Sequence, residues 1–407
     1  MSTQRLLLTD LHIFDGHASN LTDAQDILIE AGRIREIGAN LRAEGARVLK
    51  GTGRFAIPGL IDAHFHANAP LLDIEMADRM PHSLLAQHAR LSLQGALQRG
   101  FTTLRDAGGA DRGLAMALEA GLIPGPRLFF AGKALSQTGG HGDLAPLGAP
   151  ACACAYSGTL TEVVDGVDAV RLAVRKALRD GASQIKLMVS GGVLSESDPI
   201  WSNQFSDEEI AAAVAETGAR RAYVMAHAHG ADAAARCARL GVRSVEHGTL
   251  IDAPTAVELA AAGTYVVPTL GIIDALRSLP VGAVQSRVLD KLALVGDQAR
   301  AAVAACRDAG VRLGLGTDLL GELQTRQSRE FLMRAEIQPA LDVLKSATSI
   351  NAEMMMMEGE LGEVSVGALA DILVLNRNPL ENVRVLADPD ATIDAIICRG
   401  QIVKGDQ

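Results

Sequence analysis

The residues of this sequence best suited to chemistry are histidines, and His64 and His66 stand one residue apart. They close the segment 57–66, an apolar run with the composition of a β-strand. Side chains alternate between the two faces of a strand, so both imidazoles point the same way. Neutral imidazole is a common ligand of divalent metals, and two rings aimed at one point can hold such an ion. A lone pair of this kind also arises by chance or as a buried polar pair, so the other ligands must come from elsewhere.

Further candidates stand on or at the end of predicted strands of their own. They are Lys186 within 183–189, His227 after 223–226, His247 after 242–246 and Asp318 after 312–317. In a parallel α/β barrel the carboxyl ends of the strands meet at one rim, which carries the active site. Six such side chains at one rim are poorly explained by packing. For Lys186 taken alone, a salt bridge to Asp318 is the alternative.

The elements that must position these side chains follow a regular alternation. From residue 58 to about residue 351, short apolar strands alternate with Ala-rich helices, which predicts parallel βα units and, from the number of strands, a (β/α)8 TIM barrel. Both ends of the chain have strand and hairpin patterns instead. Neither end is long enough alone for a good core, so we expect them to pair into one small β-sandwich-like domain. The predicted boundaries are 1–58 plus 362–407 for the small domain and 59–361 for the catalytic barrel.

Composition excludes several classes of function. The 407 residues carry a net charge of −10 and no long Lys/Arg run, which argues against nucleic acid as a partner. No apolar run reaches the length of a membrane span, and the first ten residues hold too short an apolar run for a signal peptide. The five cysteines are sparse and odd in number, which argues against a disulfide framework. We therefore expect a cytoplasmic protein.

Two glycine-rich loops add polar candidates. The segment 135–158 contains His141, and a loop of that length in a compact domain is more often functional than idle. Cys152 and Cys154 in the same loop could bind metal or be redox-active, although two unreactive loop thiols are the simpler interpretation. Gly191 follows the lysine strand, where glycine lets the backbone approach a metal or substrate closely. A phosphate cradle is the competing interpretation of Gly191, but no P-loop Lys-Ser/Thr follows.

The whole constellation resembles the amidohydrolase superfamily in its binuclear form with a carboxylated lysine. The similarity spans nearly the whole chain and is carried by residues 58–66, 184–186, 245–248, 316–318 and the return segment 362–380. It implies that His64, His66 and Asp318 bind a more buried metal. It also implies that His227 and His247 bind a more exposed metal, and that carboxylated Lys186 bridges the two. Zinc is the implied metal, and a homo-oligomer, in some relatives an octamer, is the implied assembly.

A carboxylated lysine is chemically reasonable, because a carbamate supplies two anionic oxygens whereas an ammonium cannot ligate a cation. Two metals would hold a hydroxide between them, since coordination lowers the pKa of bound water towards neutrality. Asp318 would take the proton from that water and pass it to the leaving nitrogen. The expected reaction is therefore hydrolysis at a carbonyl, with an amide as the expected substrate.

Residues 138–143 and 226–230 resemble one branch of the superfamily. It contains Xaa-Pro dipeptidases, metal-dependent carboxypeptidases acting on N-acyl amino acids, and ochratoxin-hydrolysing amidases. The resemblance implies that His141 and a tyrosine ahead of the fifth-strand histidine, here Tyr223, contact the substrate carboxylate. His229 would point the same way as His227, as a substrate contact or a supporting residue; a cap of the next helix is the alternative. The expected enzyme releases a C-terminal amino acid from an N-acyl amino acid or dipeptide-like substrate.

Two other functions remain open at this point. A cyclic-amide hydrolase, such as an imidazolonepropionase, or a deaminase belongs to the same superfamily. Deaminases generally use one metal and no bridging lysine, so Lys186 argues against them. A non-catalytic relative would be expected to lack ligands, and none is missing here. Arg105 and Asp106, at the end of the second barrel strand, are expected to form an internal ion pair rather than a substrate clamp.

Overall fold

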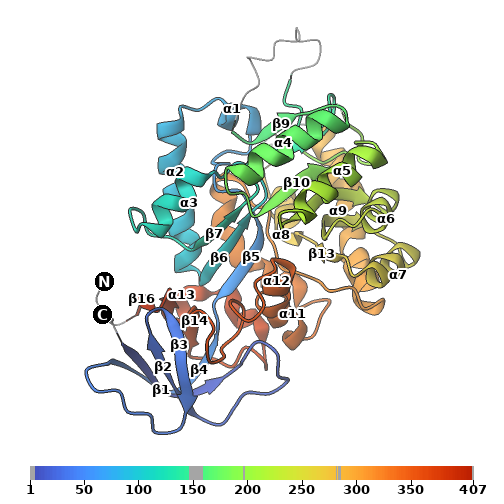
Figure 1. Ribbon diagram of the computed structural model, residues 1–407. Helices are drawn as coiled ribbons and strands as arrows, with labels where there is room; N and C mark the ends of the chain where they lie inside the picture. Colours follow the sequence, from blue (N-terminus) through green and yellow to red (C-terminus); the bar gives the residue numbers. More distant parts are fainter. Residues whose placement is uncertain (1–4, 146–158, 196–197, 281, 283–285, 406–407) are drawn as a thin grey trace. The chain divides into compact units, whose positions relative to one another are not determined.

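The two ends of the chain form one seven-stranded sheet (Figure 1). The computed structural model describes residues 5–145, 159–195, 198–280, 282 and 286–405. The sheet order is β16-β15-β14-β4-β1-β2-β3, with β1 and β4 parallel and the other pairs antiparallel. Its strands are β1 (Leu6–Ile13), β2 (Gln25–Glu30), β3 (Arg33–Gly38), β4 (Arg47–Pro58), β14 (Ile372–Leu375), β15 (Ile393–Cys398) and β16 (Gln401–Lys404).

The core of this sheet comes from both ends of the chain. Leu8 and Ile27 from the first strands are fully buried in one cluster with Ile372 and Ile397 from the last strands. The pairing of β4 with β14 joins residue 55 to residue 375 and residue 58 to residue 372. Each end alone would leave an apolar face in water, so burial of these aliphatic side chains stabilises their association. The predicted pairing of the two ends is confirmed.

The described residues fall into two compact units. One unit takes residues up to 62, residues 94–103 and residues from 328 onwards; the other takes 63–93 and 104–327. The first unit adds short helices to the sheet: α10 (Glu330–Arg334), α11 (Ala340–Ser346), α12 (Ser349–Met354), α13 (Pro389–Thr392) and the 3-10 turn η2 (Val383–Ala387). The predicted domain boundaries, 1–58 plus 362–407 and 59–361, stay a prediction.

Short, mostly buried strands alternate with helices through the middle of the chain, as predicted. The strands are β5 (Leu60–Phe65), β6 (Phe101–Asp106), β7 (Arg127–Phe130), β8 (Ala134–Ser136), β9 (Thr161–Val163), β10 (Gln184–Met188), β11 (Tyr223–Gly230), β12 (Ser244–Leu250) and β13 (Tyr265–Val267). Those from β8 to β13 form a parallel sheet in the order β13-β12-β11-β10-β8-β9, while β5, β6 and β7 form another.

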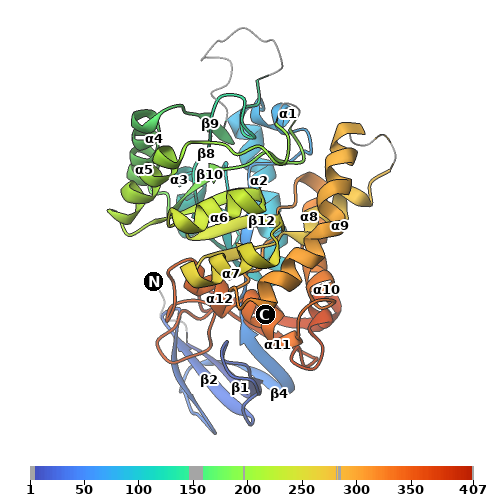
Figure 2. The same ribbon diagram turned by 90° about the vertical axis from the view of Figure 1, so that its right-hand side faces the viewer.

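Helices follow most of these strands. They are α1 (Ile74–Asp78), α2 (His82–Gln98), α3 (Arg112–Glu119), α4 (Val167–Arg179), α5 (Asp207–Gly218), α6 (Ala231–Arg239), α7 (Ala253–Ala262), α8 (Leu270–Arg277), α9 (Ser286–Asp308) and the 3-10 helix η1 (Gly321–Arg329). A capping box begins α5, with Ser206 and Glu209 each accepting from the other's backbone N–H. Both α6 and α9 pack against β12 (Figure 2). No helix of the described part is long and apolar enough to cross a membrane.

Backbone hydrogen bonds join these strands into a closed ring. Ser183 N–H donates to the Phe130 carbonyl at 3.0 Å beside β7 and β10, and Ala63 N–H donates to the Leu315 carbonyl at 2.9 Å. The predicted eighth strand, 312–318, is not a regular strand in the structure. It pairs through one isolated bridge, Leu313 to Val266. Its chain passes so close to β5 that a Cβ at position 316 would overlap the backbone and Cβ of His64, which explains the glycine there.

Candidate metal centre and active site

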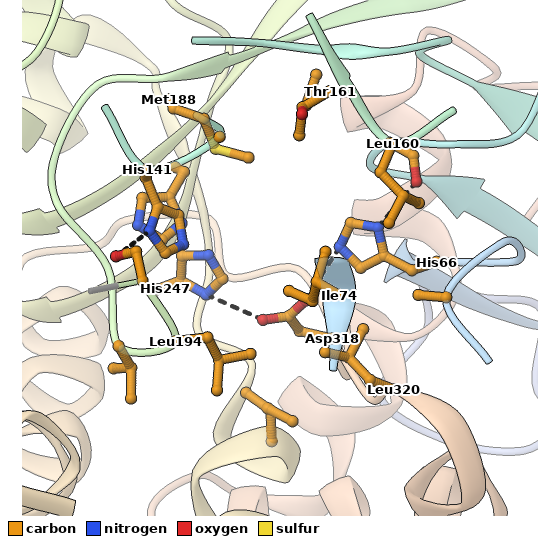
Figure 3. Close-up of a pocket in the computed structure, with 18 of the residues that line it drawn as sticks. His66, Ile74, His141, Leu160, Thr161, Met188, Leu194, His247, Asp318 and Leu320 are labelled. Atoms are coloured by element: carbon orange, nitrogen blue, oxygen red, sulfur yellow. Dashed lines mark hydrogen bonds and ion pairs between the residues drawn. The ribbon is translucent and has the colours of Figure 1, made fainter. Parts of the chain in front are cut away.

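A cavity of about 540 Å³ lies where the strands of the second unit end (Figure 3). All six side chains that the sequence selects as metal ligands line it, together with two of the predicted substrate contacts. The six are His64, His66, Lys186, His227, His247 and Asp318; the two are His141 and His229. The rule that parallel strands collect their carboxyl ends at one rim accounts for this convergence.

Asp318 is the point on which the imidazoles converge. The Nε2 atoms of His64 and His66 lie 3.3 and 3.2 Å from Asp318 Oδ1, and His247 Nδ1 lies 3.8 Å from Oδ2. Figure 3 shows His66 and Asp318 on one side of the cavity and His247 with His141 across from them. One donor atom from each of His64, His247 and Asp318 falls within 4.8 Å of the others, a spacing that suits a single cation.

Hydrogen bonds on the far side of two rings select the tautomer that a metal needs. His64 Nδ1–H donates to Glu246 Oε2 at 2.7 Å, and His66 Nδ1–H donates to the Gly108 carbonyl at 3.0 Å. A carboxylate and a carbonyl can only accept, so Nδ1 of each ring carries a proton, and Nε2 is the atom available to a metal. Outer hydrogen bonds of this type orient metal-binding histidines in general.

The backbone is strained within or after the strands that carry these groups. His247 has φ +72°, Asp318 has φ +56° and Thr269 has φ +47°, all in the left-handed region although none is glycine. The His247 ring is held by a 2.7 Å contact between Nδ1 and Thr269 Oγ1. Strain of this kind persists where the surrounding structure fixes it, and it gathers at functional sites.

Lys186 is buried among these histidines. It is 1% exposed, and its Nζ lies 3.5 Å from His64 Nε2. Within the described residues the ion pairs of Asp318 run to His64, His66 and His247, so the expected alternative of a Lys186–Asp318 salt bridge is not formed. Burial lowers the pKa of Lys186 to about 8, which leaves part of the amine neutral near physiological pH. A neutral amine is the form that reacts with carbon dioxide.

His227, His247 and Asp318 are also in ionisation states that suit metal ligands. Burial holds the pKa values of His227 and His247 well below the ordinary value, so both rings are neutral at pH 7. Burial opposes ionisation of Asp318, but its contacts with His64 and His66 hold its pKa well below the ordinary range. Neutral imidazoles beside a carboxylate are a donor set that suits divalent transition metals.

His141 and His229 stack on the histidines of this cluster and also line the cavity. The His141 ring stacks on the His227 ring at 4.3 Å, and its Nδ1 lies 2.9 Å from Ser195 Oγ and 3.3 Å from Asp198 Oδ2. His229 stacks on His247 at 5.0 Å, with Nδ1 2.8 Å from Thr249 Oγ1. The alternative of His229 as a helix cap is wrong, because the N-cap of α6 is Gly230 and no side chain caps the helix.

Two predicted substrate contacts lie away from the cavity surface. Tyr223 is the first residue of β11 and lies between Arg105 and Arg243, whose guanidinium carbons are 6.0 and 5.8 Å from the ring centre. The four residues from Tyr223 to His227 span about 13 Å of strand, so the structure does not bring Tyr223 to the site. Gly191 also lies outside the lining, but its carbonyl is 3.2 Å from His227 Nε2.

Sequence reasoning missed a buried network beneath the metal ligands. Arg105 is in an internal ion pair, as expected, but its partner is Glu246 at 2.8 Å and not Asp106. Neighbours on a strand face opposite ways, and Asp106 instead accepts from backbone N–H groups at Ala67, Gly108 and Ala110. The sequence signal for this network is Glu246, the acidic residue directly before His247.

The rest of the cavity is aliphatic. Its apolar lining consists mainly of Leu72, Ile74, Leu160, Leu194, Ile272, Ile273, Leu276, Val288, Leu292 and Leu320. Besides Asp318 the lining includes the carboxylates Asp73, Glu75 and Asp143, and Lys186 is the one lysine or arginine among the described lining residues. Such a surface suits an uncharged, apolar group. Cys152 and Cys154 lie outside the described residues, while Cys237, Cys306 and Cys398 are buried.

Comparison with known proteins identifies the family. The sequence profile of the amidohydrolase family matches residues 55–403. The chain belongs to the amidohydrolase family. Ochratoxinase of Aspergillus niger is 32% identical over 372 residues, which cover 86% of this chain and 75% of that protein. The predicted superfamily and branch are thereby confirmed.

Solved structures of the family agree with this assignment. A prolidase complexed with N-methylphosphonate-L-proline has a TM-score of 0.95 at 42% identity, covering 99% of this chain and 100% of the other. A Xaa-Pro dipeptidase with methionine in its active site has a TM-score of 0.88 at 29% identity, covering 99% and 100%. The structure of A. niger ochratoxinase has a TM-score of 0.87 at 26% identity, covering 100% and 97%.

These similarities confirm the predicted fold, a (β/α)8 barrel with a small β domain. They also show the general reaction, because members of this branch hydrolyse carbon–nitrogen bonds. The chain is therefore a hydrolase of amide bonds. Amidohydrolases generally use divalent metal ions, and the His64, His247 and Asp318 group fits that requirement.

Proposed function

We propose that this amidohydrolase releases a C-terminal amino acid from an N-acyl amino acid or a dipeptide-like substrate. The observation that carries the proposal is the convergence of two imidazole Nε2 atoms on one oxygen of Asp318, next to a buried lysine. Similarity to a prolidase, a Xaa-Pro dipeptidase and an ochratoxinase supports this substrate class, which includes aromatic amides of the ochratoxin type.

The proposed site holds two divalent cations, with zinc as the expected metal. His64, His66 and Asp318 would hold one, His227 and His247 the other, and carboxylated Lys186 would lie between them. When bound, such cations acidify a water molecule and polarise the amide carbonyl. The donor set fits: the described residues supply neutral imidazoles, one carboxylate with a depressed pKa, and a partly neutral lysine amine.

The protein's own groups handle the proton and the substrate. Asp318 is ionised at neutral pH and faces the cavity, so it can accept a proton from the attacking water and deliver it to the leaving nitrogen. His141 and His229 face the same space and would bind the carboxylate of the leaving amino acid. Gly191 would act only through its carbonyl contact with His227. Tyr223 has no direct contact in this proposal.

The wider setting is part of the same proposal. The barrel, 59–361, would carry the reaction, and the small domain, 1–58 plus 362–407, would complete the fold. Resemblance to the family favours a homo-oligomer, and an octamer is one form to test. Sparse cysteines favour a cytoplasmic location. The net charge of −10 favours small molecules over nucleic acid as ligands.

A substrate panel tests the proposal. Zinc-loaded protein should release the free amino acid from N-acyl amino acids, Xaa-Pro dipeptides or aromatic amides of phenylalanine. Lys186→Ala and Asp318→Asn should abolish release, whereas Lys176→Ala and Asp168→Asn on the exposed face of α4 should not. Full activity of both site variants would refute the mechanism. Near two metals per chain supports the binuclear site; near one favours the deaminase alternative.

A further inference from the structure

We propose that Lys291 is a positioning residue for substrate binding: from α9 it fixes the loop after β10, and that loop orients His141. The inference rests on the proposed function, because it concerns the substrate side of the same cavity. The loop is taken here as residues 191–195 and Asp198. The contact between Lys291 and this loop joins elements that are far apart in sequence. Lys291 lies 99 positions from Gly192, its first partner.

The Lys291 ammonium has three hydrogen bonds to three carbonyls of this one loop. Nζ donates to the carbonyls of Gly192 at 2.8 Å, Ser195 at 2.9 Å and Asp198 at 2.6 Å. A lysine has three N–H donors, so three carbonyls are enough to use all of them. Hydrogen bonds from a cation are stronger than neutral ones, and this side chain is largely buried. The arrangement turns three backbone carbonyls towards one point.

The anchored residues are the ones that contact His141. Ser195 Oγ lies 2.9 Å and Asp198 Oδ2 3.3 Å from His141 Nδ1. The backbone of Gly192 lies against the ring so closely that a Cβ there would overlap it. Asp198 is itself fixed, since its Oδ2 accepts from Gly192 N–H at 3.0 Å and from the Gln204 amide at 3.3 Å. Its pKa is lowered by His141 and Lys291 in spite of burial, so it is a carboxylate.

The three hydrogen bonds of Lys291, which we call the clamp, also join two walls of the cavity. Val193, Leu194 and Ser195 of the loop line it, and so do Val288 and Leu292, which flank Lys291 on α9. Lys291 therefore sets the distance between the loop wall and the helix wall. The three carbonyls belong to residues that are not proposed metal ligands. Loss of the clamp should disturb substrate binding while leaving the metals in place.

The closing experiment compares Lys291→Met, which keeps most of the length but removes the charge, with Lys176→Met as the matched exposed control. Lys291→Met should raise KM for the best substrate of the panel about tenfold or more, with a smaller change in kcat, because misplacement of a binding group weakens binding. Metal content should stay at the wild-type value. In metal-stripped protein, backbone amides of the loop should exchange hydrogen faster in Lys291→Met than in wild type, and Lys176→Met should match wild type in both measurements.

A chemical rescue separates position from general stability. K291C treated with 2-bromoethylamine regains an ammonium at nearly the original reach, and KM should return towards the wild-type value; wild type treated alike is the control. An unchanged KM in Lys291→Met, or a lower melting temperature with no change in KM or loop exchange, would overturn the proposal. If wild type cleaves nothing on the panel, the proposed function fails, whereas the exchange experiment still decides whether Lys291 holds the loop.

Discussion

Glu246→Gln should weaken both the fold and the metal site, because one carboxylate serves both. Glu246 Oε1 accepts from Arg105 at 2.8 Å and from Ser244 Oγ at 2.6 Å, while Oε2 accepts from His64 Nδ1–H at 2.7 Å. The ion pair of Arg105 with Glu246 is wholly buried. Glutamine keeps the shape but replaces one accepting oxygen with an NH2 donor. Either Arg105 or His64 then faces a donor instead of an acceptor.

The expected size follows from that burial. Removing one partner of a buried ion pair costs about 3–5 kcal/mol, because the other charge stays buried without compensation. Loss of an outer hydrogen bond to a metal-binding histidine weakens metal binding by roughly 10–100-fold. Burial by itself raises the pKa of Glu246, but Arg105 and His64 together hold it at about 2. This folded-state pKa lies below the unfolded value of about 4.3, so the stabilisation is complete above that pH and is lost as pH falls towards 2.

Urea unfolding of metal-free protein and chelator competition for bound zinc measure the two effects. The control is Glu216→Gln, which removes the same charge from an exposed pair with Arg175 and should change neither quantity much. At pH 7 the Glu246 variant should unfold at clearly lower urea, and the difference from wild type should shrink below about pH 4.3. A variant within about 1 kcal/mol of wild type at pH 7, with unchanged zinc retention, would show that the network is not the support described here.

Three further outcomes follow from the site. Gly192→Ala should raise KM, because its Cβ would displace the His141 ring, while Gly218→Ala, which has open space, should not; equal kinetic constants would contradict this. Cys237 should resist iodoacetamide at pH 8 in the folded protein, since burial raises its pKa to about 12; early labelling of its peptide by mass spectrometry would contradict that. Substrates with neutral apolar acyl groups should have higher kcat/KM than those with an acidic acyl group, because aliphatic residues and carboxylates line the cavity away from the histidines; equal values would contradict that.

The sequence was informative where the relevant rule is local. His227 and His247 each end a short apolar run, and barrel topology brings such ends together whatever the loops do. The same rule shows why Tyr223 is remote: it begins β11, and His227 lies four residues further along the same strand. Position along the strand therefore predicts which residues reach the site better than closeness in sequence to a ligand does.

Side-chain contacts between residues far apart in the chain could not be predicted from local sequence patterns. Glu246 meets His64 across 182 positions. Strict alternation would also place Glu246 and His247 on opposite faces of β12, yet both lie close to His64, because the positive φ of His247 breaks the alternation within the strand. The intrinsic preference of histidine does not predict a left-handed backbone conformation, because the surrounding hydrogen bonds impose that conformation.

The electrostatics of the cavity explain why a lysine stands where an acid would be expected. Beneath the cavity, Arg105 and Glu246 neutralise each other, so they add little net charge to it. Within it, burial keeps His227 and His247 neutral, and Asp318 is the one carboxylate beside the histidines among the described lining residues. In the proposed binuclear site a single carboxylate would do little to balance two dications, and a fixed acid at position 186 would carry an uncompensated buried charge before they bind. A lysine with its pKa lowered to about 8 would avoid that cost, because its neutral amine would become a carbamate anion by adding carbon dioxide and releasing one proton when the cations bind.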